Sequence, residues 1–258
     1  MIRSRLMGAL GRQDWMAVCI ELVTVVLGLF LGLQLNAWKD ASDAQAREQA
    51  ALVRLQQESE TIVAYFRKSL DTNDRLNADR EGAIVALSTG DKAKFKPSEL
   101  GDHIGALSFF PGIAPPRAVY DELSGSGLFN EIGSVSVRTA VANYYSALAF
   151  IQSQLDYFRQ GTTARFAEPG PGMTVVYDPK GRTLPDRFVH NADFNVIAGN
   201  PAFMTKLVDA LRDQMVFQSY RKGIEKQAEA MCKSLAQALH ETCAAAAQPA
   251  PPAQPGAP

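Results

Sequence analysis

Glu21 is the side chain with the clearest chemical potential in this sequence, because it begins an apolar run. From Leu22 to Leu33 only Thr24 and two glycines interrupt the large apolar residues. A carboxylate within a membrane span is costly and by default marks a proton site or a contact with a partner. Glu21 lies about 9 Å beyond Trp15 along a helix, near one end of the span. We therefore expect an assembly role rather than proton translocation, the alternative being a carboxylate that reaches the interface or pairs with Arg12.

Two glycines share a helical face with Glu21. Gly28 and Gly32 form a GxxxG pattern, and at about 100° per residue they lie on the same stripe as Glu21 and Thr24. Close helix packing in lipid requires small and polar residues on one face, because lipid offers no hydrophobic drive for association. We predict that Glu21, Thr24, Gly28 and Gly32 form an association face.

The histidines and serines do not form a catalytic or metal-binding set. His190 with Asp193, and His240 with Cys243, have a spacing of three residues that brings two ligands together, but a metal site needs three or four. The serines of Ser124–Gly127 lack the strand-to-helix context of a nucleophile elbow. We therefore predict no catalytic residue, no metal site and no cofactor.

Cys232 and Cys243 form a candidate disulfide. Eleven residues along one continuous helix would separate them by about 16 Å, which is too far for a bond. Either the helix breaks between them, or they pair between chains, or they remain free thiols. Cys19, inside the apolar run, is expected to be an inert small residue.

Composition excludes a nucleic-acid partner. The 258 residues include 26 Lys and Arg against 27 Asp and Glu, so the formal net charge is −1. No basic excess is present that would attract a phosphate backbone.

The apolar run predicts one transmembrane helix at 15–38, with Trp15 and Trp38 as interface anchors. Arginines concentrate before it, within 1–14, and acidic residues follow it. By the positive-inside rule, the tail 1–14 is cytoplasmic and the rest of the chain is periplasmic. A cleavable signal peptide is the rival interpretation, but Glu21 within the span and Trp38 at its end argue against it.

Residues 39–243 are expected to form a helical extracytoplasmic domain. The span continues without Gly or Pro into a stalk helix that weakens near 71–74 and ends at 89–90. Later helices are expected from Ser98 to about Ser108, at 118–123, from about Ser136 to before Glu168, and from a cap at Asn200 to about Thr242, weakened near Gly223. Apolar residues at helical spacing mark the inward faces. They are Leu52, Leu55, Ile62, Phe66 and Leu70 in the stalk, and Val137, Val141, Tyr144, Tyr145, Leu148, Ile151, Leu155 and Phe158 in the longest later helix.

Three other segments have distinct expectations. Phe109–Arg117 contains three prolines and is predicted to be a rigid crossing loop that inserts Phe109 and Phe110 into the core. A hairpin is predicted at about 174–184, with strands 174–177 and 182–184. The Ala/Pro-rich tail 244–258 is expected to be disordered. The predicted fold class is therefore mainly α, with one transmembrane helix, a stalk, a helical bundle and one small β-hairpin.

The span resembles the N-terminus of a widespread bacterial group of single-pass membrane proteins of unknown function. That group's signature is E-x6-G-x3-[AG]-x-Q-x-N-x-W, which is matched here by Glu21, Gly28, Gly32, Gln34, Asn36 and Trp38. The segment 118–132 is similar to the group's aromatic-x-x-Leu-x-x-Ser-Gly element, here Tyr120, Leu123, Ser126 and Gly127, and 137–145 resembles its next helix. The resemblance covers roughly residues 12–160 and implies topology and architecture, but no activity.

These features favour a non-enzymatic protein of the bacterial inner membrane. Its expected partners are the lipid bilayer and either a second copy of the chain or an unidentified membrane protein. The alternative is a periplasmic ligand-binding or sensory domain. Because the cytoplasmic tail has only about a dozen residues, a sensor would need a partner protein to pass on its signal.

Overall fold

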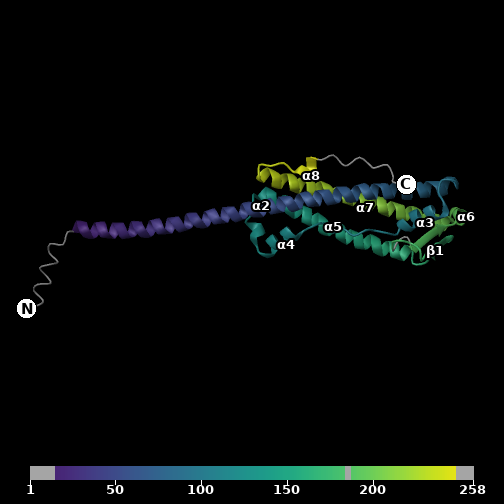
Figure 1. Ribbon diagram of the computed structural model, residues 1–258, viewed down its shortest axis with the longest axis horizontal. Coiled ribbons are helices and arrows are strands. Elements are labelled where there is room, and N and C mark those ends of the chain that lie inside the picture. Colours follow the sequence, from purple (N-terminus) through teal and green to yellow (C-terminus); the bar gives the residue numbers. More distant parts are fainter. Residues whose placement is uncertain (1–14, 184–186, 248–258) are drawn as a thin grey trace, which may run out of the picture. The chain divides into compact units, whose positions relative to one another are not determined.

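The computed structural model describes residues 15–183 and 187–247, with the side chains of 20–183 and 187–245 (Figure 1). It confirms the predicted fold class: the chain is mainly helical, with a small two-stranded antiparallel sheet. The chain divides into two compact units, Met1–Ala51 and Leu52–Pro258. We describe each unit by itself.

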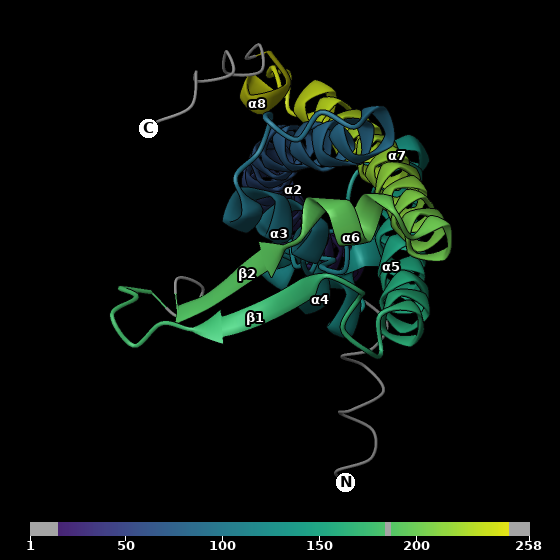
Figure 2. The same ribbon diagram turned by 90° about the vertical axis from the view of Figure 1, so that its right-hand side faces the viewer.

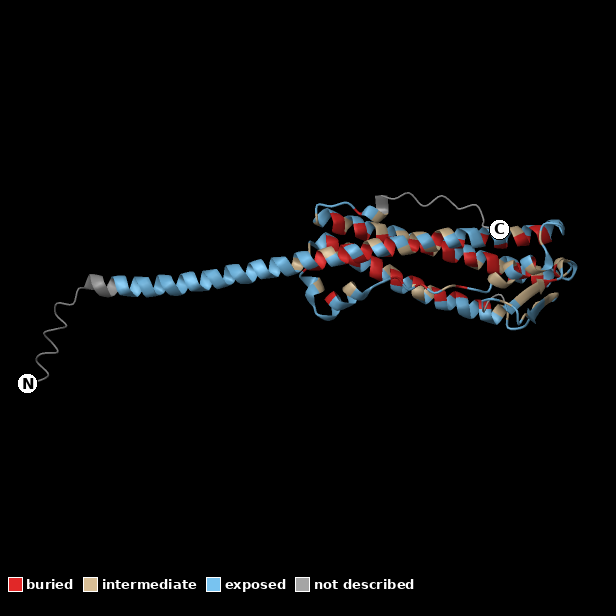
Figure 3. Cartoon of the chain, viewed as in Figure 1, coloured by how far each residue is buried: buried red, intermediate tan, exposed pale blue. Residues whose placement is uncertain are grey.

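Helix α2 (Trp15–Thr89) supplies all described residues of the first unit. Every side chain from 20 to 47 is exposed, including the large apolar ones (Figure 3). Helix α2 is unbroken at 71–74, where the sequence predicts a weakening. Predictions for the tail 1–14 and for the side chains of Trp15 and Cys19 lie outside the described residues.

Three long helices form the bundle of the second unit: the part of α2 from Leu52 onward, α5 (Val135–Arg165) and α7 (Pro201–Ala238) (Figures 1 and 2). The predicted inward stripes on α2 and α5 are buried, as expected. Helix α7 completes the core with apolar residues at helical spacing, among them Phe203, Leu207, Phe217, Ile224, Met231 and Leu235.

Helix ends follow local chemistry. The Ser134 side chain accepts a hydrogen bond from the Val137 amide at the start of α5, and Asn200 caps α7 before Pro201, as predicted. Helix α3 (Pro97–Ala106) is capped at Lys96 rather than at Ser98, because Pro97 takes the first helical position. Helix α7 passes Gly223 without interruption and ends at Ala238, earlier than predicted.

Short elements lie at both ends of the bundle. Those beside the start of the α2 segment in this unit are α4 (Ala118–Gly125), the 3-10 turn η2 (Leu128–Asn130) and α8 (Ala244–Ala247) (Figure 1). Those at the other end are β1 (Met173–Tyr177), β2 (Phe188–Ala192) and α6 (Phe194–Ala198), and Figure 2 shows this sheet beside α3 and α6. Helix α8 corrects the predicted disorder of 244–258 in its first four residues, and residues 248–258 are outside the described part.

The second strand of the hairpin differs from the prediction. The first strand is confirmed, but its partner is β2, with Thr174 opposite Asn191, rather than 182–184. The turn at 178–181 forms, since the Gly181 amide donates to the Asp178 carbonyl at 3.2 Å. The second strand begins only at Phe188, because the segment that pairs with β1 is also the one that packs on α3. An alanine Cβ at Gly101 would overlap the backbone carbonyl of His190, so only glycine permits this approach.

Candidate functional site

The predicted association face lies on exposed helix. Glu21, Thr24, Gly28 and Gly32 all fall within α2, and a Cβ at either glycine would meet no atom within 4 Å. The Thr24 hydroxyl donates to the Ile20 carbonyl at 2.7 Å, so this polar side chain is satisfied within its own helix. The face is therefore open to contact another molecule.

The surrounding surface is apolar. Large side chains on every side of this stretch, from Ile20 to Leu35, are more than half exposed, as is Trp38. A contiguous apolar surface of this size is unfavourable in water and marks a membrane or protein contact. By length and composition, this is the one described helix that could cross a membrane.

A carboxylate from α2 organises the start of α4. The buried Glu58 accepts hydrogen bonds from the amides of Val119 (2.8 Å) and Tyr120 (3.2 Å) and from the Tyr145 hydroxyl (3.1 Å). The free amides and positive end of a helix N-terminus stabilise a negative charge. Glu58 thus caps α4 from a distant part of the chain, a role that sequence analysis missed because Glu58 is only one of many charged residues in the stalk.

The residues of the second resembling element, Tyr120, Leu123, Ser126 and Gly127, shape α4 and the turn that follows it. Tyr120 stacks on Tyr145 with ring centroids 3.6 Å apart, and Leu123 is buried. Ser126 is the C-cap of α4, and Gly127 follows with a φ of +79°, which favours glycine. Burial, followed by the charge and hydrogen bond of Glu58, raises the pKa of Tyr145, and burial raises that of Tyr144. Both phenols therefore stay neutral at physiological pH.

Residues 106–114, here called the crossing segment, receive side-chain hydrogen bonds from three helices. Its carbonyls accept from Arg80 of α2 (Ala106, 2.8 Å), Gln214 of α7 (Leu107, 2.9 Å; Phe109, 3.1 Å), Arg159 of α5 (Phe110, 2.9 Å), Arg221 of α7 (Pro111, 3.3 Å) and Gln152 of α5 (Ile113, 3.1 Å). Phe110 is buried as predicted, but Phe109 is 63% exposed, so only one of the two rings enters the core. Buried backbone without secondary structure needs such partners, and side chains supply them here.

Arg80 and Arg221 are the buried cations of this network. Neither forms an ion pair with a described carboxylate, and burial lowers the pKa of each to about 10. The Nε of each has no hydrogen-bond partner among the described atoms. Because the Nη2 of each donates to a backbone carbonyl of the crossing segment, Ala106 for Arg80 and Pro111 for Arg221, we assign them to the architecture of that segment.

Cys232 and Cys243 form a disulfide within the chain, with Cα atoms 5.7 Å apart. This resolves the three alternatives in favour of a break between them. Helix α7 ends at Ala238 with Leu239 as its C-cap, and His240 adopts a φ of +58°. The amide of Glu241 donates to the Ala236 carbonyl at 2.8 Å and that of His240 to Gln237 at 3.2 Å, a Schellman turn that reverses the chain.

The disulfide holds the C-terminal segment against α2. Glu60 accepts from the Ala244 amide at 2.9 Å, beside both sulfur atoms. Since the sulfurs are bonded to each other, neither is a free thiolate for a metal. A carboxylate of α3 lies beside His190: the His190 Nδ1 is 3.5 Å from the Asp102 Oδ1.

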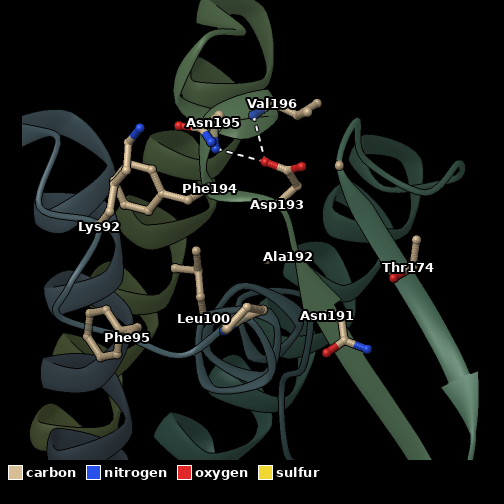
Figure 4. Close-up of a pocket in the computed structure, with 12 residues that line it drawn as sticks. Lys92, Phe95, Leu100, Thr174, Asn191, Ala192, Asp193, Phe194, Asn195 and Val196 are labelled. Carbon is tan, nitrogen blue, oxygen red and sulfur yellow. Dashed lines mark hydrogen bonds between the residues drawn. The ribbon is translucent and has the colours of Figure 1, made fainter.

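One cleft was not found by sequence analysis. It has a volume of about 660 Å³ and lies between β1, β2, the start of α6 and the loop that follows α2. Figure 4 shows Lys92, Phe95 and Phe194 on one side of it and Thr174 and Asn191 on the other. These residues come from segments up to about 100 positions apart, so no local motif could reveal it.

No protein-family model matches this chain, and searches of curated proteins and of solved structures found no similar protein. Function is therefore argued from the site itself.

Proposed function

We propose that this chain is a membrane-anchored, non-enzymatic interaction protein that associates through Glu21, Thr24, Gly28 and Gly32. The partner is a second copy of the chain or another membrane protein. The observation that carries the proposal is the combination of two open glycine positions and a carboxylate on one face of an exposed apolar helix. Glycines let two helix backbones approach closely, and a carboxylate in lipid gains most from a polar partner.

Within this proposal, residues 15–38 cross the bacterial inner membrane with the N-terminus in the cytoplasm, and the helical domain is periplasmic. The excess of arginine before the span supports this orientation. The disulfide is also consistent with an oxidising compartment. We further propose membership of the bacterial group that the signature of the span resembles.

The test is co-purification of two differently tagged full-length copies, and of membrane partners, in mild detergent. Gly28→Leu with Gly32→Leu is expected to reduce association at least about tenfold, because leucine side chains prevent close backbone approach. The matched control is Val26→Leu with Phe30→Leu, which changes the opposite face at the same spacing and should leave association intact.

Both variants keep the helix apolar, so equal amounts in the membrane fraction are expected. Unchanged association of the double glycine variant, at equal membrane levels, would overturn the proposal. Orientation is tested separately with C-terminal fusions: alkaline phosphatase should be active and β-galactosidase inactive, and the reverse pattern would contradict a periplasmic domain.

A further inference from the structure

The cleft beside the sheet has the dimensions of a small-molecule site. Its volume of about 660 Å³ lies within the range of roughly 300–1,000 Å³ that is usual for such sites. Its polar strand residues form a cross-strand pair, since Thr174 lies opposite Asn191 in the register of β1 and β2. Side chains that lie directly opposite each other project from the same face of the sheet.

Several polar groups of the cleft are not used by the protein. Lys92, Thr174, Asn191 and Asn195 make no side-chain hydrogen bond or ion pair within the part of the chain that the structure describes. Asp193 is only partly used: its Oδ1 accepts from the amides of Asn195 (2.9 Å) and Val196 (3.2 Å), as Figure 4 shows, while Oδ2 has no partner among the described residues. Donors and acceptors that make no internal hydrogen bond thus line one hollow.

Opposite the polar pair, the cleft has an aromatic and apolar wall. Phe95 and Phe194 each pack partly against the core that includes Leu100, so their positions are fixed by the fold. An aromatic face carries partial negative charge and favours the slightly positive C–H groups of a ligand. The site therefore offers an apolar side and a hydrogen-bonding side.

The charge of the cleft excludes a strongly anionic ligand. Lys92 and Asp193 are the two charged residues of its lining, and they balance each other. Phosphate recognition uses several cations or paired guanidinium groups, which this lining lacks. The side-chain amides of Asn191 and Asn195 and the hydroxyl of Thr174 each combine donor and acceptor capacity. Such groups suit a ligand that carries hydroxyl groups on adjacent carbon atoms.

We propose that this cleft binds a small saccharide of one or two rings. The sugar hydroxyls bond to Asn191, Thr174 and Asn195, and one C–H face of a ring lies against Phe194. This inference is independent of the association face on α2, because it concerns other residues and a different ligand. It gives the domain a binding role of its own.

The experiment is saturation-transfer difference NMR on the full chain in nanodiscs. The probes are cellobiose and chitobiose, with leucine, glutamate and a dialanine peptide as non-sugar probes. At least one saccharide is expected to give a signal, strongest for the ring protons of one face. None of the non-sugar probes should compete with it.

The cleft variant is Thr174→Val with Asn191→Ala, which removes two side chains that make no internal hydrogen bond. It should weaken saccharide binding by about tenfold or more, because the ligand hydroxyls lose their partners. The control is Asn143→Ala on the exposed face of α5, which should bind normally. Three results would overturn the proposal: no saccharide signal, a signal from non-sugar probes alone, or saccharide binding that survives the cleft variant.

Discussion

Tyr144 and Tyr145 are neighbours in the sequence, but their hydroxyl groups have opposite surroundings. The Tyr145 hydroxyl donates to Glu58 at 3.1 Å, whereas the Tyr144 hydroxyl is buried without a hydrogen-bond partner among the described atoms. A satisfied buried group contributes to stability, and an unsatisfied one costs free energy. The two phenols should therefore respond differently to the same substitution.

We predict that Tyr145→Phe lowers the free energy of unfolding by about 1–3 kcal/mol, because Glu58 loses one of its donors. Tyr144→Phe should leave stability unchanged or raise it, because it removes a polar atom that has no partner. Denaturant unfolding of the full chain in detergent compares the two. Equal losses for both variants would show that ring packing, not the hydroxyl, decides the effect.

At the residue scale, sequence analysis found what repeats or stands out against its neighbours. The buried stripes of α2 and α5 follow from helical spacing, and Glu21 stands out within an apolar run. Glu58 and Arg80 could not be found in this way, since charged residues are common in a stalk helix. Their roles appear only when α4 and the crossing segment are in place.

At the scale of elements, two glycines of α3 determine how closely it approaches β2. A Cβ at Gly101 would overlap the backbone of His190, whereas a Cβ at Gly105 would lie 3.6 Å from the His190 ring, an ordinary contact. The strand that sequence analysis missed is therefore selected by a partner helix. Its own residues include His190 and Asn191, which give little β signal.

Gly101→Ala is expected to destabilise the protein by about 1–3 kcal/mol, because two backbones must separate. Gly105→Ala, in the same helix and against the same residue, should be neutral or stabilising by up to about 1 kcal/mol through reduced chain entropy. Thermal unfolding of the two variants provides the measurement. A Gly101→Ala protein as stable as the Gly105→Ala protein would contradict the close approach of α3 and β2.

At the scale of the whole molecule, the disulfide links the last turns of α7 to the segment that contacts α2. The sequence left three possibilities because it did not reveal where α7 ends. The Schellman turn at His240 decides between them, and a single histidine is too weak a signal to place a left-handed residue in advance, because few non-glycine residues adopt that conformation. The cleft was beyond prediction for a related reason: it exists only where the sheet, α6 and the loop after α2 meet.

Reduction of Cys232–Cys243 is expected to lower the free energy of unfolding by about 2–3 kcal/mol, as the loop-entropy model gives for a short closed loop. Hydrogen exchange should increase at Ala244 and Ala245, where the segment contacts α2. The measurement is Tm and amide exchange with and without dithiothreitol. The control is Cys232→Ser with Cys243→Ser, whose Tm should not change with reductant. If a thiol assay shows that the wild-type disulfide is reduced and the wild-type Tm is nevertheless unchanged, the expectation is refuted.

The crossing segment has a consequence for limited proteolysis. Residues 107–114 and 178–183 both lie outside helices and strands, and each contains a proline (Pro111 and Pro179), so they look equally cleavable in the sequence. A protease must draw an extended stretch of backbone into its active site. In 106–114 the carbonyls are held by side chains from α2, α5 and α7, and freeing them would separate the three helices. Nicking of the native domain is thus directed away from this stretch, and a cut within it reports the opening of the whole bundle.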